Sequence, residues 1–201
     1  MNVPTVLARF VLVLLAGLSL GSCGRQMEQA SPPLAGAALG GPFTLVDQNG
    51  RTTTDKSFAG HYRAVYFGYS FCPDVCPTTL QTLMQGYRAF AAASPGLAAR
   101  LVPIFITVDP ERDTPGVLKT YVAAFGPQLV GLTGSPAAIA SAAKAYGVYY
   151  RRQVARAGSS SYLMDHSSQV VLFGPDGAPI ALVPTDQGAK AVAETLGQWV
   201  H

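Results

Sequence analysis

The amino-acid sequence predicts an α/β fold with a central, mostly parallel sheet, flanking helices and a terminal β-hairpin. Three observations predict it. Residues 64–69 and 101–109 are near-continuous apolar runs, which is typical of strands buried on both faces. Segments with apolar residues at helical spacing alternate with these runs, and such alternation builds layered α/β structures. The chain has 201 residues, 49% of them hydrophobic, which is enough for one well-packed domain with additional segments.

The N-terminal segment predicts export. Residues 10–20, FVLVLLAGLSL, have the length of a signal-peptide core and are shorter than the roughly 20 residues that a bilayer span needs. We therefore expect a signal peptide at residues 1–22. Leu-Gly-Ser-Cys, which ends at Cys23, resembles a bacterial lipobox and predicts a lipid anchor on Cys23 at the periplasmic face of the cell membrane. The alternative is an ordinary signal peptide or an uncleaved anchor, with Cys23 incidental.

Residues 23–41 predict a flexible tether between the lipidated Cys23 and a domain at 42–201. The tether sequence is small and polar, contains Pro and Gly, and has no periodic apolar face. As a coil it would span roughly 25 Å. The formal net charge is +3 without a dense basic block, which argues against nucleic acid as a partner.

Turn signals and periodicity predict the first half of the domain in order. Asn49-Gly50 lies between two alternating segments and predicts a hairpin, which precedes the apolar strand 64–69. Apolar residues at helical spacing predict a helix from Pro77 to near Pro95. The strand 101–109 follows. A second helix then begins at Thr114-Pro115 and ends at Gly126-Pro127.

The second half of the domain is predicted in the same way. After a short strand at 129–133, Ser135-Pro136 begins a third helix, with Ser as cap and Pro at its first position. Three further strands are predicted at 148–151, 169–173 and 180–183. A C-terminal amphipathic helix is predicted at 187–200. Pro175-Asp176-Gly177 is the turn of the terminal hairpin.

Two of the 3 cysteines, Cys72 and Cys76, lie between the buried strand 64–69 and the first long helix. A dithiol at this place is the arrangement of thioredoxin, so the predicted fold is thioredoxin-like. Each cysteine precedes a proline, which predicts a loop rather than regular helix for 72–76. Proximity to a helix N-terminus should lower the thiol pKa and favour thiolate. The pair could form a structural disulfide, a redox couple or a metal site.

The spacing of the two thiols, with a histidine available as a third ligand, favours a copper site. Thiolates select Cu(I), Zn or iron–sulfur centres. Zinc and iron usually take four protein ligands, whereas Cu(I) accepts two or three. We expect a histidine as third ligand, and the candidates are His61, His166 and His201. His166 is the best of these, because it lies at the start of a predicted strand, where a loop can face the cysteine turn.

Several motifs resemble, in order, those of the Sco/SenC copper proteins: FGYSFCPDVCPTTL, ITVDPERDTP, LVGLTGSP, AYGVYY and YLMDHSSQVVLFGPDG. The resemblance covers about 42–201. It implies a thioredoxin-like fold, Cu(I) or Cu(II) bound by Cys72, Cys76 and His166, and delivery of copper to the CuA site of cytochrome c oxidase subunit II or another cuproprotein. An exported dithiol also needs a thiol reductant protein as partner. The acidic and basic residues of VDPERDTP, Asp109, Glu111, Arg112 and Asp113, could support the ligands or dock a partner, but we expect them to organise a turn and cap the next helix.

Two functions compete for the same sulfurs. We expect a metallochaperone, which transfers copper without turning over a substrate. The alternative is an exported thiol:disulfide oxidoreductase, with Cys72 and Cys76 as nucleophile and resolver. Copper binding should require His166 and disulfide exchange should not. A peroxiredoxin-type enzyme is disfavoured because a Thr or Ser should lie three positions before the reactive cysteine, where this chain has Tyr69. A purely structural disulfide is disfavoured because so short a loop contributes roughly 2 kcal/mol at best.

Overall fold

The structure is a computed structural model that describes residues 31–154 and 162–201. The predicted signal peptide at 1–22, the lipidated Cys23 and the first part of the predicted tether lie outside the described residues. Within the two described ranges, every helix is too short or too polar to traverse a lipid bilayer.

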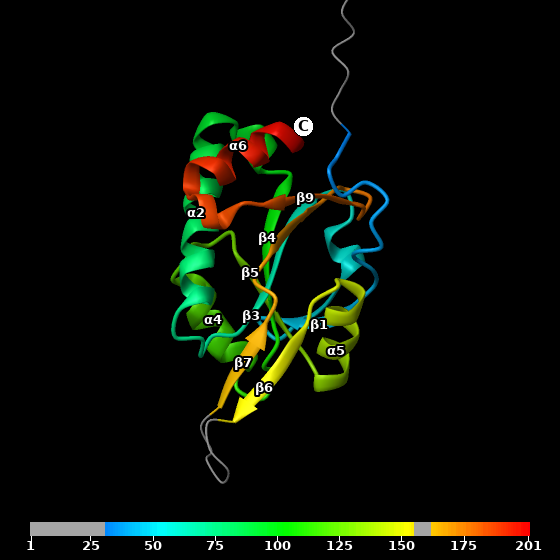
Figure 1. The fold of residues 1–201 in the computed structure, drawn as a ribbon, viewed down its shortest axis with the longest axis vertical. Helices are drawn as coiled ribbons and strands as arrows, with labels where there is room; N and C mark the ends of the chain where they lie inside the picture. The colour runs from blue at the N-terminus through cyan, green and yellow to red at the C-terminus, as the bar shows by residue number, and fades with distance from the viewer. Residues whose placement is uncertain (1–30, 155–161) are drawn as a thin grey trace, which may run out of the picture. The chain divides into compact units, whose positions relative to one another are not determined.

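A seven-stranded sheet in the order β2-β1-β5-β4-β3-β8-β9 forms the centre of the domain (Figure 1). Its strands are β1 (Thr44–Asp47), β2 (Thr52–Thr54), β3 (Tyr62–Gly68), β4 (Leu101–Thr107), β5 (Val130–Thr133), β8 (Val170–Phe173) and β9 (Pro179–Val183). β3 and β4 are fully or almost fully buried along their length, as their continuous apolar sequences predicted.

The sheet is mixed rather than mostly parallel. Only the central pairs β3–β4 and β4–β5 are parallel, and the remaining pairs are antiparallel. Two of the antiparallel pairs, β1–β2 and β8–β9, are joined by short turns, which can connect only antiparallel neighbours. The predicted α/β class and terminal hairpin are confirmed, and the parallel part is limited to the centre of the sheet.

Helices cover both faces of the sheet. They are α2 (Val75–Ala93), α3 (Pro95–Ala98), α4 (Pro115–Ala123), α5 (Pro136–Ala145) and α6 (Ala189–Trp199), with short 3-10 turns η1 (Asp55–Phe58) and η2 (Thr185–Gln187). Figure 1 shows α2, α4 and α6 on one side of the sheet and α5 on the other. α6 packs closely on α2 at Gly86, where an added Cβ would lie only 2.4 Å from the side chain of Val192. The predicted cap at Ser135 is confirmed, because its side chain accepts the backbone N–H of Ala138. Thr114 caps α4 by accepting the N–H of Val117, so the expectation that the charged residues of VDPERDTP cap this helix is wrong.

A separate two-stranded hairpin consists of β6 (Tyr150–Val154) and β7 (Tyr162–His166), with Tyr150 opposite His166. β7 was not predicted as a strand. In β7 the residues alternate between buried or half-buried and exposed positions. Leu163 is exposed and Met164 is half-buried, which hides the period-two pattern in the sequence, because hydrophobic side chains occur at both kinds of position.

Residues 32–41, here called the N-terminal strap, are part of the compact unit, which begins at Pro32. The Leu34 N–H donates to the Ile180 carbonyl of β9 at 3.0 Å, and the Gly40 N–H donates to the Ala145 carbonyl of α5 at 2.9 Å. The side chain of Leu39 packs against the core. The expected boundary near residue 42 therefore moves toward the N-terminus. Sequence composition could not reveal this, because backbone hydrogen bonds to β9 and α5 hold the strap.

Candidate metal centre

The two cysteines follow the buried strand β3. Cys72 lies half-buried in the loop after the strand, and Cys76 is 0% exposed in the first turn of α2. The prediction of a loop for residues 72–76 is therefore wrong for Val75 and Cys76, which begin α2. The first amide groups of a helix have no intrahelical acceptor, so Pro77 can occupy the first turn without the loss of a hydrogen bond.

The three predicted ligands converge. Cys76 Sγ lies 3.2 Å from His166 Nε2, and the ligand atoms of Cys72, Cys76 and His166 all lie within 4.8 Å of one another. His166 is the last residue of β7, so the β6–β7 hairpin brings it to the cysteines. The other two candidates are elsewhere: the ring of His61 lies near the Ala59 carbonyl, and His201 lies against Tyr62.

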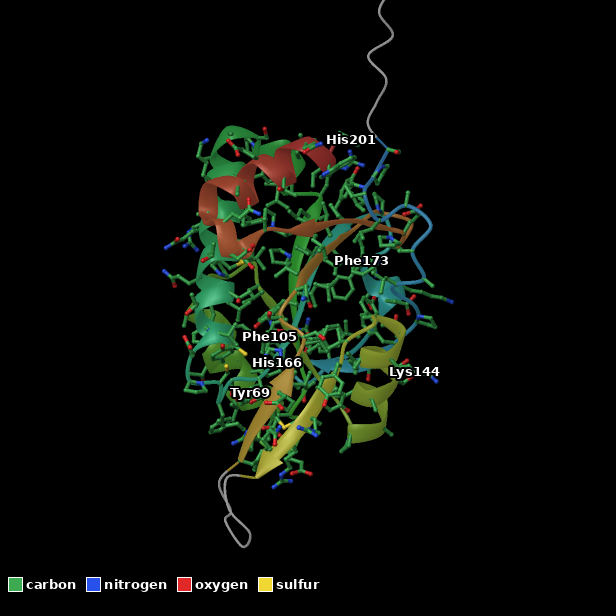
Figure 2. The ribbon with its side chains drawn as sticks, viewed as in Figure 1. Tyr69, Phe105, Lys144, His166, Phe173 and His201 are labelled. Atoms are coloured by element: carbon green, nitrogen blue, oxygen red, sulfur yellow. The ribbon has the colours of Figure 1, made fainter. Side chains whose placement is uncertain are left out.

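The His166 ring is held in one tautomer. Its Nδ1 lies 2.9 Å from the Ser167 carbonyl oxygen, which can only accept, so Nδ1 carries a proton. In the neutral ring Nε2 then holds the free lone pair that a metal ion needs, and this lone pair faces Cys76. The rings of Tyr66 and Tyr69 contact the imidazole edge to face, with centroid distances of 6.2 and 5.8 Å. Figure 2 shows Tyr69 close to His166.

Burial, and not the helix N-terminus, dominates the acidity of Cys76. Its removal from water raises the pKa of the Cys76 thiol to about 12. The expected lowering of this pKa is therefore wrong for the metal-free protein. A neutral Cys76 thiol donates to His166 Nε2, and the Cys76 backbone N–H donates to Cys72 Sγ at 3.4 Å. A bound cation would supply the positive charge that a buried thiolate requires.

Gly68 allows Cys76 to lie this close to the sheet. A Cβ added at Gly68 would meet Cys76 Sγ at 3.0 Å, the Tyr66 ring at 3.1 Å and the Phe105 ring at 2.9 Å. These separations are shorter than ordinary van der Waals contacts, so any larger residue at the end of β3 would require these neighbours to shift. Sequence reasoning missed this residue, although a glycine inside a buried strand often indicates close approach of another group.

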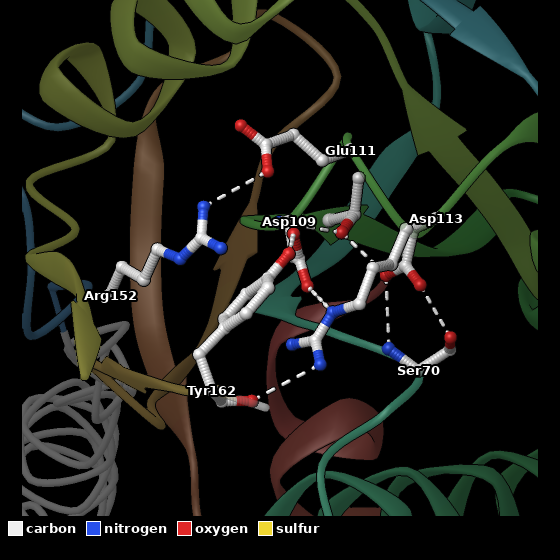
Figure 3. A network of polar contacts seen from close by, with 8 residues as sticks. Ser70, Asp109, Glu111, Asp113, Arg152 and Tyr162 are labelled. Carbon is white, nitrogen blue, oxygen red and sulfur yellow. Dashed lines mark hydrogen bonds and ion pairs between the residues drawn. The ribbon is translucent and has the colours of Figure 1, made fainter. Parts of the chain in front are cut away.

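A network of polar contacts joins the cysteine loop to the loop that follows β4 (Figure 3). The buried Asp113 accepts hydrogen bonds from the backbone and hydroxyl of Ser70 and, at 2.6 Å, from the hydroxyl of Thr107. Ser70 lies two positions before Cys72. The carboxylate therefore fixes the start of the cysteine loop against β4, a positioning role beyond the expected turn.

The same network continues to the hairpin that carries His166. The buried Asp109 accepts the Tyr162 hydroxyl at 2.8 Å and forms an ion pair with Arg112. The guanidinium groups of Arg112 and Arg152 stack on the Tyr162 ring, 3.7 and 3.6 Å from its centroid. Arg152 also pairs with Glu111 at 3.1 Å. These contacts attach β6 and β7 to the β4–α4 loop.

The fold and the site together define a thioredoxin-like domain with a group of two sulfurs and one imidazole that could bind a soft metal ion. The family model described as SCO1/SenC matches residues 31–201. The chain therefore belongs to the SCO1/SenC family, and both the predicted resemblance and the thioredoxin-like fold are confirmed.

Two curated relatives illustrate the similarity. The chain is 40% identical over 185 residues to "Protein SCO2 homolog, mitochondrial" of Bos taurus, which covers 87% of this chain and 68% of that protein. It is 43% identical over 139 residues to "Protein SCO1 homolog, mitochondrial" of Mus musculus, which covers 69% of this chain. The chain spans only 48% of the length of this second relative.

Solved structures agree with the family. ScoI from Bradyrhizobium japonicum with copper bound is 40% identical, with a TM-score of 0.73, and the match covers 81% of this chain and 99% of that one. BsSco, described as a member of the Sco family of cytochrome c oxidase assembly proteins with a disulfide switch, is 25% identical, with a TM-score of 0.59 over 85% of this chain and 99% of that one.

Proposed function

We propose that this chain is a metallochaperone that binds copper through Cys72, Cys76 and His166 and delivers it to the CuA site of cytochrome c oxidase subunit II or another cuproprotein. The observation that carries the proposal is the convergence of two sulfurs and one imidazole nitrogen within 4.8 Å. This ligand set suits Cu(I), which accepts three soft ligands. The copper-bound ScoI and the oxidase-assembly role stated for BsSco support the choice of metal and process.

The exposure of the two sulfurs suits transfer of the ion. Cys76 is fully buried, whereas Cys72 is half-buried in the loop. An incoming thiolate from a recipient can therefore approach the ion from the side of Cys72, while Cys76 and His166 still hold it. Each thiol that binds the ion releases one proton, so both loading and transfer depend on pH.

A titration of the full, reduced chain with Cu(I) against a competing chelator tests the proposal. We expect one copper per chain, with binding abolished in Cys72→Ser and Cys76→Ser. In His166→Ala the affinity should fall while the more accessible thiol, Cys72, remains reactive toward an alkylating reagent. Tight binding in the double cysteine variant would exclude this site, and unchanged affinity in His166→Ala would mean a different third ligand.

One observation favours a second function, thiol:disulfide exchange. Cys72 is the more accessible sulfur and accepts the backbone N–H of Cys76, as expected for an attacking thiolate with a buried resolving partner. A thiol reductant protein would then be needed to restore the pair. Reduction of a disulfide substrate by His166→Ala at the wild-type rate would support this activity, and its absence in the wild-type chain would exclude it.

We also propose that residues 1–22 are a signal peptide and that Cys23 is lipidated, which would place the domain at the periplasmic face of the membrane. The sequence pattern alone supports this proposal. Mass spectrometry of the N-terminus of the mature protein tests it: a diacylglyceryl-modified Cys23 is expected, and an unmodified N-terminus at another residue would contradict it.

A further inference from the structure

We propose that the Tyr66 hydroxyl donates a hydrogen bond to the Cys76 sulfur when copper is bound, and that this donor contributes to the affinity of the site. The inference rests on the proposed function, because it concerns the copper-loaded state of the same ligands. It assigns a role to a residue of β3 that lies outside the Cys-Cys-His group.

The first observation is an unused donor. Tyr66 is 0% exposed, and its Oη has no hydrogen-bond partner among residues 31–154 and 162–201. Buried hydroxyls in folded proteins are nearly always bonded, because an unpaired one loses its bonds to water without replacement. An orphaned hydroxyl beside a metal centre therefore indicates an acceptor that exists in another state of the site.

The second observation is the position of the ring. The side chains of Tyr66 and Cys76 both border the space above Gly68, since a Cβ there would lie 3.1 Å from Tyr66 Cε1 and 3.0 Å from Cys76 Sγ. The Tyr66 ring also contacts the His166 ring.

Copper binding changes what Cys76 can accept. In the metal-free protein the neutral Cys76 thiol donates to His166 Nε2, so its sulfur is a weak acceptor. When copper binds, the thiol proton leaves to solvent, the sulfur bonds to the ion, and the Nε2 lone pair also turns to the ion. The sulfur is then a buried anion, for which a nearby O–H is a favourable partner.

Tyr121 provides a matched control. Its hydroxyl is also buried without a hydrogen-bond partner among the described residues, and its ring belongs to the same aromatic cluster through Phe105. Its aromatic partners are Phe105 and Phe125 rather than His166. Tyr66→Phe and Tyr121→Phe thus remove the same atom from similar surroundings, but only the first removes a donor beside Cys76.

The experiment is a Cu(I) titration of the full, reduced chain and of both variants against a chelator, with thermal unfolding of the metal-free proteins. Hydrogen bonds to charged groups predict a rise in the Kd of Tyr66→Phe of about tenfold or more, and of at most about twofold in Tyr121→Phe. The metal-free Tyr66→Phe chain should unfold at the same or a higher temperature, because it loses an unpaired buried hydroxyl. In the Cu(II) form, the sulfur-to-copper absorption of Tyr66→Phe should move to longer wavelength.

The outcomes separate this inference from the proposed function. If the wild-type chain binds copper and Tyr66→Phe binds it equally well with an unshifted absorption, the role of Tyr66 is overturned and the metallochaperone proposal stands. An equal loss in both tyrosine variants also overturns it, because the effect would then not be specific to the donor beside Cys76. Failure of the wild-type chain to bind copper would overturn both.

Discussion

Substitution of Gly68 by alanine tests whether close packing at the end of β3 sets the position of Cys76. The added methyl group would lie 3.0 Å from Cys76 Sγ and 2.9 Å from the Phe105 ring, so both must move by several tenths of an ångström. Overpacking of this kind lowers the free energy of unfolding by about 1–3 kcal/mol. For a domain of this size, the cost corresponds to a fall in Tm of about 2–12 °C. Displacement of Sγ from its place 3.2 Å from His166 Nε2 should also weaken copper binding.

The assay combines thermal unfolding of the metal-free chain with the Cu(I) competition titration. Gly116→Ala is the matched control, because a Cβ at this position in α4 meets nothing within 4 Å. Alanine there should leave copper affinity unchanged and stabilise the helix slightly. Wild-type stability and wild-type copper affinity in Gly68→Ala would refute the argument that the glycine is needed for the approach of Cys76.

Three further predictions concern the supporting residues and the ion. Burial raises the pKa of Asp113, so this group stabilises the fold in acid and loses that contribution as pH rises through its folded pKa. As the pH falls from about 7 to about 4, the free energy of unfolding of the wild type in urea should therefore rise relative to that of Asp113→Asn. A difference that stays constant with pH would contradict this. Lysine in Arg112→Lys cannot reproduce both the ion pair with Asp109 and the stacking on Tyr162, so the free energy of unfolding should fall by about 1–3 kcal/mol. The exposed control Arg151→Lys should leave it almost unchanged. Equal unfolding temperatures for these two variants would exclude the positioning role. Free copper at about one hundred times its Kd should add about 2.7 kcal/mol to the free energy of unfolding and raise Tm by about 5–11 °C. A chelator should reverse this rise. The same rise in the double cysteine-to-serine variant would show that copper binds elsewhere.

Local signals in the sequence were sufficient for much of the fold. The starts of α4 and α5 were predicted to the residue, because Thr114 and Ser135 followed by proline are signals that act within one helical turn. The buried strands β3 and β4 were also predicted, since both faces of a central strand require apolar side chains. The three candidate ligands, which the structure brings together, were predicted from residue types and from their likeness to a family.

What the sequence did not predict depends on contacts between distant segments. The pKa of Cys76 rises because the folded chain excludes water from it, and a rule based on the helix N-terminus cannot weigh this burial. β7 escaped prediction because its hydrophobic residues occupy both exposed and half-buried positions. The roles of Gly68 and Tyr66 appear only when α2 is placed against β3.

The N-terminal strap sets the end of the domain at which the chain enters it. It joins β9 and the end of α5 through the backbone of Leu34 and Gly40. Its first residues, blue in Figure 1, lie toward the same end as His201, whereas Figure 2 places His166 toward the opposite end. With the proposed anchor at Cys23, the point of attachment and the candidate metal ligands would thus lie toward opposite ends of the domain. A recipient protein could then approach the candidate copper site without displacing the attached end of the domain.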